Sequence, residues 1–477
     1  MRVDKESDVL IVGGGCSGSL VAANLLKMAA ASKRPISITL LAKERILGLG
    51  VAYGAPSLSH VLNVPSQAMS AYVEEPDHLL RWLTARGRDA DPLGFIPRQW
   101  YGQYLSELVD DAEKEAVRQN PSLSFEVVHQ EAIELASRAN GWLVATGAGQ
   151  TFSAKQVVLA SGLYFHPNDR RLIRNPWRGF DPASFSKESS VALVGSGLSA
   201  VDMLLWLSDL DWKGPIAVFA KNGQMPLAHN RMSFAKKVTY DWSADWDRLQ
   251  SLACLFGLAR TRLSGTKLQG APWQSLIDSF RPHTQVIWGK MDTHTRKRFL
   301  RHLQGIWDVH RHRIAPEVAS RIQTLQERGF FQIKKALVTG IDQTEAKVVL
   351  RYKVLKEAPK EAESHLDLVI SCMGLETNYG RVEAPLIASS LKKGLMKSGP
   401  LGKGLLALPD GHLLDALGKV QPRLFTLGFS QHGNLWESVA VPEIRSQARA
   451  IAENVLKSSV ASAPEKEDHR GEGNLAL

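Results

Sequence analysis

The chain has 477 residues, a formal net charge of +10 and 44% apolar residues. A chain of this length exceeds a single core and predicts about two to four domains. Its basic residues are spread along the sequence, so we expect solvated surface and phosphate contacts, and no nucleic-acid partner. No apolar run approaches the roughly 20 residues that span a bilayer, and the charged start argues against a signal peptide. Three widely separated cysteines argue against a disulfide framework and fit a cytoplasmic location, which we expect for this protein.

The first predicted element is a strand buried on both faces, Asp8-Val-Leu-Ile-Val12, which leads into Gly13-Gly-Gly-Cys-Ser-Gly18 and a helix over 17–31. In a strand–turn–helix unit the first glycine makes the tight turn, the second admits a pyrophosphate, and the third allows helix and strand to pack closely. The phosphates would lie at the positive end of the helix. This pattern predicts a dinucleotide site formed by Gly13, Gly15, Cys16, Ser17 and Gly18.

A second strand, Ile36-Ser-Ile-Thr-Leu-Leu41, completes the unit. The end of this strand normally offers a carboxylate to the ribose hydroxyls, but Ala42 stands there. Glu44 is therefore our candidate for the ribose contact, although a surface glutamate at the start of a loop remains the alternative. Helices are predicted over 77–86 and 99–118.

A long segment rich in glycine, proline and serine follows the second strand and includes His60-Val-Leu-Asn-Val-Pro-Ser-Gln-Ala-Met-Ser70. Ordered loops of this length are usually functional. Asn63 has two interpretations: a catalytic and cofactor-binding residue whose amide contacts the bound dinucleotide cofactor, or a residue that caps a turn before Pro65. His60 is predicted to be a hydrogen-bonding loop residue.

Short alternating runs from Phe125 to Ser153 predict a meander with a hairpin at Asn140-Gly141. The meander ends in the apolar strand Gln156-Val-Val-Leu-Ala-Ser-Gly162, where Ser161 and Gly162 are further candidate cofactor contacts.

The whole arrangement then recurs. Ser190-Val-Ala-Leu-Val-Gly-Ser-Gly-Leu-Ser-Ala200 repeats the strand and turn, and a second strand covers 215–220. A later meander is predicted as strands over 331–334, 336–339 and 347–352, with a closing strand from Leu366. Gly195, Gly197 and Ser199 would bind a second dinucleotide, and Lys221 would meet a 2′-phosphate, which favours NADPH over NADH.

Two nested dinucleotide domains explain the repeat. The predicted fold is α/β, with Rossmann-like domains, β-meanders and a helical insertion. The boundaries we expect are 1–180 plus 366–457 for an FAD-binding domain, 188–365 for an NAD(P)-binding domain with the insertion at about 224–329, and 458–477 for a disordered tail. No metal site is expected, because the histidines near Trp307 lack nearby cysteines.

With these pieces, the chain resembles a bacterial family of uncharacterised NAD(P)/FAD-binding proteins within the two-dinucleotide flavoprotein superfamily. The resemblance rests on Gly13–Gly18, Gly48-Leu-Gly-Val-Ala-Tyr-Gly54, His60–Pro65, Met69-Ser-Ala71, Trp307-Asp-Val-His-Arg-His-Arg313 and Leu435-Trp-Glu-Ser-Val-Ala-Val-Pro-Glu-Ile-Arg445. It implies bound FAD and an NAD(P)H site. It also implies that the closing segment returns to the flavin, with Gly428, Leu435, Trp436 and Glu437 as candidate cofactor contacts; Trp436 and Glu437 could instead be packing residues.

The superfamily includes flavin-dependent N-hydroxylases, and no CxxC or CxxxxC pair is present for disulfide reduction. We therefore expect an FAD-dependent oxidoreductase that uses NAD(P)H, a monooxygenase acting on a small molecule. The alternatives are a non-catalytic redox-sensing or scaffolding flavoprotein and a flavin reductase that serves a protein partner. The sequence gives neither the substrate nor the oligomeric state.

Overall fold

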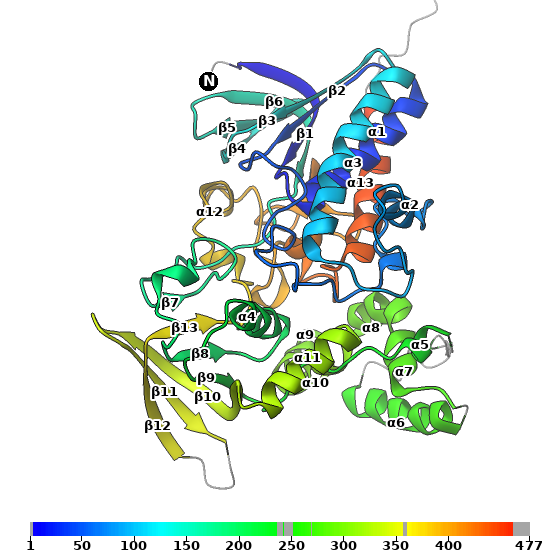
Figure 1. Cartoon of the computed structure of the whole chain (residues 1–477). Helices are drawn as coiled ribbons and strands as arrows, with labels where there is room; N and C mark the ends of the chain where they lie inside the picture. Colours follow the sequence, from blue (N-terminus) through cyan, green and yellow to red (C-terminus); the bar gives the residue numbers. More distant parts are fainter. Residues whose placement is uncertain (1–2, 236–241, 243–250, 269, 356–359, 461–477) are drawn as a thin grey trace, which may run out of the picture.

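The protein is described by a computed structural model that covers residues 3–235, 242, 251–268, 270–355 and 360–460. Two sheets organise it, as Figure 1 shows, with one sheet at the top and the other at the lower left. Among the described residues, no helix has both the length and the apolarity needed to cross a membrane.

The first sheet has the strand order β14-β15-β6-β1-β2-β3, and β4 and β5 form a hairpin on β6. Strands β1, β2, β3, β6 and β15 run parallel, so their carboxyl ends share one edge. Its strands are β1 (Lys5–Val12), β2 (Ile36–Leu41), β3 (Leu123–Val128), β4 (Ala132–Arg138), β5 (Gly141–Thr146), β6 (Thr151–Leu159), β14 (His412–Leu414) and β15 (Val420–Thr426).

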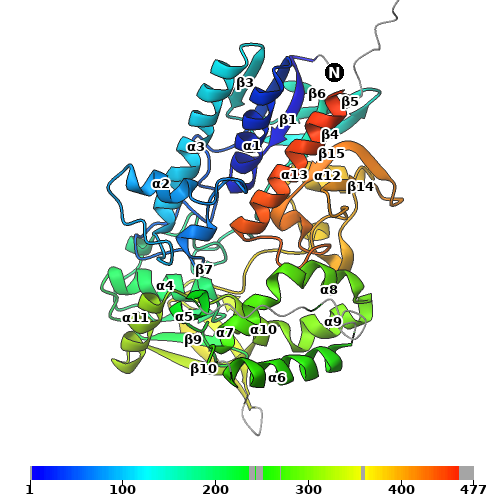
Figure 2. The same cartoon turned by 90° about the vertical axis from the view of Figure 1, so that its right-hand side faces the viewer.

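Both faces of the first sheet are covered, which explains the continuous apolar run in β1. Val9 and Ile11 pack into a core formed with the helices α1 (Cys16–Ser32), α3 (Arg98–Gln119) and α13 (Val441–Val460), which lie side by side in Figures 1 and 2. Leu10 and Val12 point to the opposite core, which includes residues of β5 and of α12 (Pro385–Lys392). A further helix, α2 (His78–Thr84), precedes α3.

The second sheet repeats this plan in the order β12-β11-β10-β9-β8-β13-β7. Val191 and Leu193 of β8 face a core shared with α4 (Leu198–Asp209) and α11 (Pro316–Glu327). Its strands are β7 (Leu172–Ile173), β8 (Val191–Val194), β9 (Ile216–Ala220), β10 (Phe331–Gln343), β11 (Val348–Val354), β12 (Lys360–Leu366) and β13 (Leu368–Ser371). The predicted fold of two Rossmann-like units is confirmed.

Two sequence predictions need correction here. The first domain was expected to resume at 366, but this boundary falls too early, because β13 pairs in parallel with β8 and belongs to the second sheet, where the repeat of the meander had placed its closing strand. Its pairing with β7 also takes Leu172–Ile173 out of the first sheet. The predicted strands 331–334 and 336–339 are one strand, β10, whose first half pairs with β9 and whose second half pairs with β11.

The predicted insertion is helical and lies beside the second sheet, at the lower right of Figure 1. It contains α5 (Arg231–Ala235), α6 (Leu252–Leu268), α7 (Trp273–Ser279), α8 (Thr284–Lys290), α9 (Thr293–His302) and α10 (Gln304–Arg311). At the other end of the chain, residues 458–460 of the predicted tail extend α13. The rest of that tail, 461–477, lies outside the described residues.

Candidate functional site: two glycine turns and a cavity

The first glycine turn, Gly13–Gly18, requires glycine for two separate reasons. Gly13 has a φ of +110°, and a Cβ there would lie 2.4 Å from the carbonyl oxygen of Ala160. A Cβ on Gly18 would lie 1.8 Å from the carbonyl oxygen of Gly13. The Gly13 N–H donates to Leu41 O and the Ala160 N–H donates to Val12 O, each over 2.8 Å. These contacts fix the turn between the ends of β1, β2 and β6.

The helix α1 begins immediately after this turn, with Gly15 as its N-cap in an extended conformation and no side chain capping its first amides. The first N–H groups of a helix have no intrahelical acceptor, and the helix dipole adds a partial positive charge there. Gly15, Cys16 and Ser17, at the start of this helix, line a cavity. This arrangement is suited to bind a pyrophosphate.

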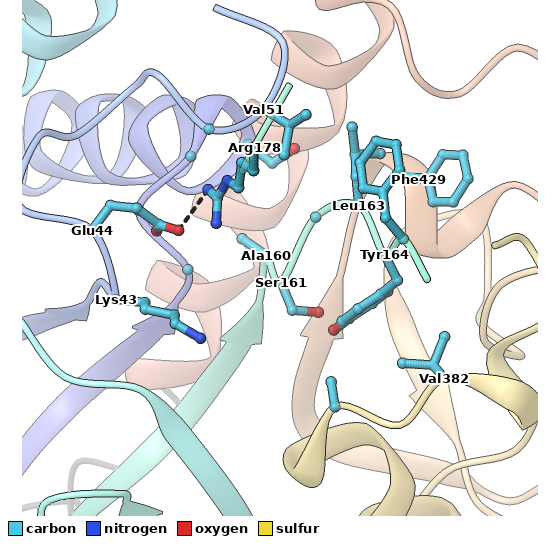
Figure 3. A pocket seen from close by; sticks show the side chains of 18 of the residues that line it. Lys43, Glu44, Val51, Ala160, Ser161, Leu163, Tyr164, Arg178, Val382 and Phe429 are labelled. Carbon is cyan, nitrogen blue, oxygen red and sulfur yellow. Dashed lines mark hydrogen bonds and ion pairs between the residues drawn. The ribbon is translucent and has the colours of Figure 1, made fainter. Parts of the chain in front are cut away.

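The cavity has a volume of about 800 Å³. It lies at the carboxyl ends of the first sheet's parallel strands, where doubly wound sheets bind their ligands. Figure 3 shows its wall, where side chains from the β6 end, such as Ser161 and Tyr164, face the Lys43–Glu44 loop across the opening. Gly162 also lines it, and its carbonyl oxygen accepts a hydrogen bond from Tyr379 (3.3 Å). The volume is within the usual range for cofactor sites, about 300–1,000 Å³.

The end of β2 carries the ribose-side residues. Ala42 is fully buried, and a Cβ built on Gly14 would lie 2.5 Å from its methyl group, so the turn packs directly on this alanine. Glu44 lines the cavity and accepts a hydrogen bond at Oε1 from Arg178 Nη2 (2.7 Å), the pair marked by a dashed line in Figure 3. Lys43, also in the lining, pairs with Glu131 (2.9 Å). The structure thus places Glu44 at the cavity, where it is paired with Arg178, a residue that was not predicted from the sequence.

Cys16 faces this cavity beside Tyr53. Burial raises the pKa of the Cys16 thiol to about 12, and it also raises that of the Tyr53 hydroxyl. A raised pKa disfavours the thiolate, which supports the expectation that Cys16 is a small packing residue at the turn.

The C-terminal segment closes the cavity. Gly428, with a φ of +70°, lies so close to the first turn that a Cβ on it would be 3.0 Å from Ser17 Oγ. Phe429, Val439 and Ile444 complete the lining, Ile444 from the first turn of α13. The predicted return of this segment to the first unit is therefore present, and sequence reasoning missed the apolar residues that make the contact.

Trp436 and Glu437 were candidate cofactor contacts, but they lie outside the cavity. Neither they nor Leu435 line the cavity. Trp436 packs in the apolar core of the helical insertion, with its ring stacked on Trp288 at 4.8 Å between centroids. The packing alternative therefore describes Trp436 in this structure.

Glu437 joins two motifs that lie far apart in the sequence. Its Oε1 accepts a hydrogen bond from Trp307 Nε1 (2.8 Å), and its Oε2 accepts one from Arg311 Nε (2.9 Å). The Glu437 and Arg311 side chains are 8% and 12% exposed, and Glu437 has a left-handed φ of +57°. Six residues further on, Glu443 forms a bidentate pair with Arg281 (2.7 and 2.9 Å). Two buried or half-buried carboxylates thus tie the C-terminal segment to the insertion.

Asn63 lies at the contact between the two units and not in the cavity lining. Its carbonyl oxygen accepts a hydrogen bond from His229 Nε2 (2.9 Å). His60 is fully buried and its Nε2 donates to the carbonyl oxygen of Asp202 in α4 (2.9 Å), as expected for a hydrogen-bonding loop residue. Arg98 forms a buried ion pair with the same aspartate (2.8 Å). The loop joins the units; a catalytic role for Asn63 stays a prediction.

The second glycine turn copies the backbone of the first. Gly195 has a φ of +105°, its N–H donates to Phe219 O (2.8 Å), and a Cβ on it would lie 2.6 Å from the carbonyl oxygen of Cys372. The Cys372 N–H donates to Val194 O (2.8 Å), and Gly197 is the extended N-cap of α4. Nothing lies within 4 Å of a Cβ built on Gly197. The predicted repeat therefore extends to individual hydrogen bonds.

Two lysines flank the strand end that follows this turn. Lys221 comes directly after β9 and is exposed, and Ser199 lies in the first turn of α4. Lys335 pairs with Ala220 across the sheet, and its side chain packs over Gly223, where a Cβ would lie 3.2 Å from Lys335 Cβ. The sequence analysis found only Lys221, because Lys335 reaches this place through a strand more than a hundred residues away.

No group of three histidine, cysteine, aspartate or glutamate side chains within the described part of the chain is placed to hold a metal ion. The histidines of the Trp307–Arg313 motif make local contacts instead. His310 Nδ1 donates to Ile306 O (2.8 Å), and His312 lies 3.5 Å from Asp308.

Residues 10–164 match a family model described as FAD-NAD(P)-binding. No curated protein matches the sequence. Solved structures match over nearly the whole chain. The ornithine N-hydroxylase of Kutzneria sp. 744, described with reduced FAD, NADP⁺ and L-ornithine, is 14% identical with a TM-score of 0.63, over 95% of this chain and 100% of that chain.

Two further structures show the breadth of this likeness. The FAD-bound cadaverine monooxygenase of Erwinia amylovora is 12% identical, with a TM-score of 0.63 over 100% of both chains. The bacillithiol disulfide reductase of Staphylococcus aureus is 12% identical, with a TM-score of 0.52 over 95% of this chain and 99% of that chain. At these identities the likeness establishes the fold alone, that of two Rossmann-like units in one chain. It does not choose between oxygenation and disulfide reduction.

Proposed function

We propose that this protein is an FAD-dependent oxidoreductase that uses NADPH, and that it is a monooxygenase which hydroxylates an amine nitrogen of a small molecule. The observation that carries the redox part is the cavity of about 800 Å³ at the uncapped N-terminus of α1, a helix within the segment that matches the FAD-NAD(P)-binding family. When bound, FAD would accept reducing equivalents from NADPH and pass them to oxygen.

The residues of the first unit fit FAD. The backbone amides at Gly15, Cys16 and Ser17 would hold the pyrophosphate, and Glu44 with Arg178 would bracket the adenosine ribose. In the second unit, the open Gly197 would admit the pyrophosphate of NADPH, and Lys221 with Lys335 would meet its 2′-phosphate.

The cysteines argue against the disulfide reductases that share this fold. Such reductases need two thiols that can pair beside the flavin. Cys16 lies at the first turn, Cys372 follows β13 in the second sheet, and Cys254 is exposed on α6. Burial raises the pKa of both Cys16 and Cys372 well above the usual thiol value. The positions and pKa values of the cysteines therefore favour an oxygenase over a disulfide reductase. We also propose a cytoplasmic location, where NADPH is available and thiols stay reduced.

The substrate class rests on the neighbours. Several similar structures are described as enzymes that hydroxylate ornithine, lysine or cadaverine, all small primary amines. We therefore expect a small amine as substrate for this chain, a step that rests on the shared fold and on the missing dithiol.

The test has two stages. FAD-reconstituted protein is mixed with NADPH without oxygen, and bleaching of the flavin absorbance is followed; we expect rapid bleaching, with NADH slower. Oxygen and a panel of amines are then added, and hydroxylamine product is measured. A chain that cannot be reconstituted with FAD would reject the enzyme proposal.

A second candidate, a flavin reductase for a protein partner, predicts the same bleaching without hydroxylated product. In that case cytochrome or dye reduction would be fast while every amine remained unchanged. A scaffolding role is favoured only by Ala42, where the ribose carboxylate is missing. It predicts bound flavin that NADPH does not bleach.

A further inference from the structure

Three tyrosines lead from the first cavity into the core of the first unit. Tyr53 lines the cavity, and its ring contacts that of Tyr101 edge to face, with 4.8 Å between the ring centroids. The ring of Tyr101 in turn lies 5.5 Å from that of Tyr104. Tyr101 and Tyr104 are both fully buried, and they share one face of α3 because they are three residues apart. The rings therefore follow one another from the cavity to the interior.

The Gly48–Gly54 loop, which carries Tyr53, is held directly against α3. A Cβ built on Gly102, the neighbour of Tyr101, would lie 2.7 Å from the carbonyl oxygen of Tyr53. A Cβ built on Gly48 would lie 2.5 Å from the Cβ of Leu105. A side chain at either glycine would push the loop away from the helix. These two glycines therefore set the close spacing of the first two rings.

Packing alone does not explain the hydroxyl group of Tyr101. This group is buried and makes no hydrogen bond in the part of the chain that the structure describes. A buried hydroxyl without a partner costs about 1–3 kcal/mol, and phenylalanine would fill the same space without that cost. A phenol ring, however, loses an electron far more easily than a phenyl ring does. Electron transfer thus gives a reason for tyrosine at this position.

The series of rings ends at a residue that can release a proton. Tyr104 Oη lies 2.8 Å from His78 Nδ1. The Tyr104 hydroxyl already accepts the N–H of Ala71 (3.0 Å), which leaves its own proton for Nδ1. Burial lowers the pKa of His78, so its imidazole is neutral at pH 7 and can accept a proton. An oxidised phenol is a very strong acid and needs such an acceptor. His78 is half-buried, so solvent reaches this pair.

The next ring, that of Trp82, is a poor place for a further oxidation. It lies 5.6 Å from the ring of Tyr104. The guanidinium groups of Arg86 and Arg88 lie over it, at 4.2 and 5.1 Å from its centroid. An indole that loses an electron becomes a cation, which two adjacent positive charges oppose. The oxidised state is therefore expected to stay on Tyr104.

We propose that Tyr53, Tyr101 and Tyr104 form a relay that carries a one-electron oxidation from the first cavity to the Tyr104–His78 pair and so protects the cavity wall. The relay rests on the proposed function, because oxygenases that turn over without substrate release hydrogen peroxide, whose one-electron reduction gives the hydroxyl radical.

The electrons and protons of this step balance. A hydroxyl radical in the cavity takes one electron from Tyr104 through the other two rings and becomes hydroxide. The Tyr104 proton passes to His78 Nδ1, which leaves a neutral tyrosyl radical beside an imidazolium. A thiolate in solution then gives one electron at the His78 surface and becomes a thiyl radical, and His78 returns the proton to Tyr104.

Illumination of the full-length, FAD-reconstituted chain without oxygen tests the relay, because light-excited flavin is a one-electron oxidant. Ferricyanide is present to take the electron from the flavin, and the frozen sample is studied by high-frequency electron paramagnetic resonance. We expect a tyrosyl radical whose largest g value is lowered by a hydrogen bond from the His78 imidazolium. Tyr101→Phe removes only an oxygen without a partner, yet it should reduce this signal at least about tenfold. His78→Phe should remove the lowered g value.

Tyr379→Phe is the matched control. Tyr379 is also fully buried and one ring away from the cavity, since it lies 5.5 Å from the cavity-lining Tyr164. Its hydroxyl donates to the carbonyl oxygen of Gly162 (3.3 Å), which cannot take up the proton. Tyr379→Phe should therefore leave the Tyr104 signal unchanged. Equal losses in Tyr101→Phe and Tyr379→Phe, or a signal that survives Tyr101→Phe, would overturn the relay.

The same samples separate the relay from the proposed reaction. The radical forms without NADPH, so a chain whose bound flavin NADPH does not bleach can still show it. Bound flavin without any tyrosyl radical would reject the relay alone, and a chain that binds no flavin would reject both proposals. Prolonged illumination should also modify Cys16, beside Tyr53 in the cavity wall, at least about threefold faster in Tyr101→Phe. Mass spectrometry measures this, and equal rates would reject the protective role.

Discussion

The two glycine turns have nearly the same backbone and very different surroundings. Their N-cap glycines, Gly15 and Gly197, have φ/ψ values of −76°/−168° and −77°/−165°. Tyr53 and Phe429 line the cavity at the first turn, and a Cβ on Gly15 would lie 3.6 Å from Gly50 Cα, whereas no atom lies within 4 Å of a Cβ on Gly197. The strand–turn–helix unit thus supplies phosphate binding in both places, and later segments decide how enclosed each site is. An enclosed site suits a cofactor that stays bound, and an open site suits one that exchanges in every turnover.

Substitution of the N-cap glycines gives the largest expected effect. Gly15→Ala and Gly197→Ala fall at ordinary backbone angles without steric overlap, so the unfolding free energy of the cofactor-free chain should change by less than about 0.5 kcal/mol. The added methyl group would occupy the space of a pyrophosphate, and a loss of roughly 100-fold in affinity, about 2.7 kcal/mol, is expected.

The two variants should fail in different ways. Gly15→Ala should purify without flavin absorbance, whereas Gly197→Ala should keep the flavin and need far more NADPH to bleach it. If both variants lost the same cofactor, the assignment of one cofactor to each turn would be wrong.

The segment that encloses the first turn is expected to depend on Glu437. Glu437→Ala leaves Arg311 buried without its carboxylate, which typically costs about 3–5 kcal/mol. Chemical denaturation should show this loss, together with faster release of FAD and little change in the NADPH concentration needed for half-maximal reduction. Glu363→Ala, at a glutamate that is 58% exposed, is the control and should stay within about 0.5 kcal/mol. Equal effects of Glu437→Ala and Glu363→Ala would contradict the proposal that Glu437 holds the C-terminal segment to the insertion.

The open turn is expected to depend on its lysines. Lys335→Ala and Lys221→Ala should each raise the KM for NADPH about fivefold to tenfold, the cost of one charged contact of about 1–1.4 kcal/mol. The KM for NADH should not change, since NADH has no 2′-phosphate. Lys187→Ala provides a control at an exposed lysine outside the β9 end. A parallel rise for NADH would show that the lysines act on something other than the 2′-phosphate.

The smallest expected effect is a pH dependence of the unfolding free energy that comes from Asp308 in the insertion. Burial, with a smaller contribution from nearby Glu437, raises the pKa of Asp308 to about 6. Because the unfolded chain releases this proton near pH 4 and the native chain near pH 6, native stability should fall between these values and level off above pH 6. Asp308→Asn removes this dependence, so its stability relative to the unchanged chain should rise between pH 4 and pH 7. Denaturation midpoints of both chains at pH 4 and pH 7 measure this change in relative stability. A relative stability that stayed constant between the two pH values would refute the raised pKa of Asp308.

Local patterns made the two units predictable. The requirement for glycine at Gly13 and Gly195 arises from a turn of a few residues, so it is visible in the sequence. The apolar run of β1 also reports directly that both of its faces are covered. The placement of β13 was harder, because an apolar strand fits either sheet equally well and only its pairing with β8 decides.

The surroundings of the turns were not predictable, because they depend on contacts between residues that lie far apart in the sequence. Arg178 reaches Glu44 across 134 positions, and Trp307 reaches Glu437 across 130. The motifs that contain Trp307 and Glu437 were both evident in the sequence, yet nothing in either motif specifies the other as its partner.

Glu437 has a consequence for anyone who wishes to make this protein more robust. Its left-handed backbone costs about 1 kcal/mol or more for a residue with a side chain, so glycine is the usual stabilising replacement. Glycine would also remove the carboxylate that Trp307 and Arg311 bind. A design procedure guided by backbone preference alone would therefore choose a substitution that detaches the insertion from the C-terminal segment lining the first cavity. Selection for thermal tolerance at this position would then weaken the wall of the proposed cofactor site.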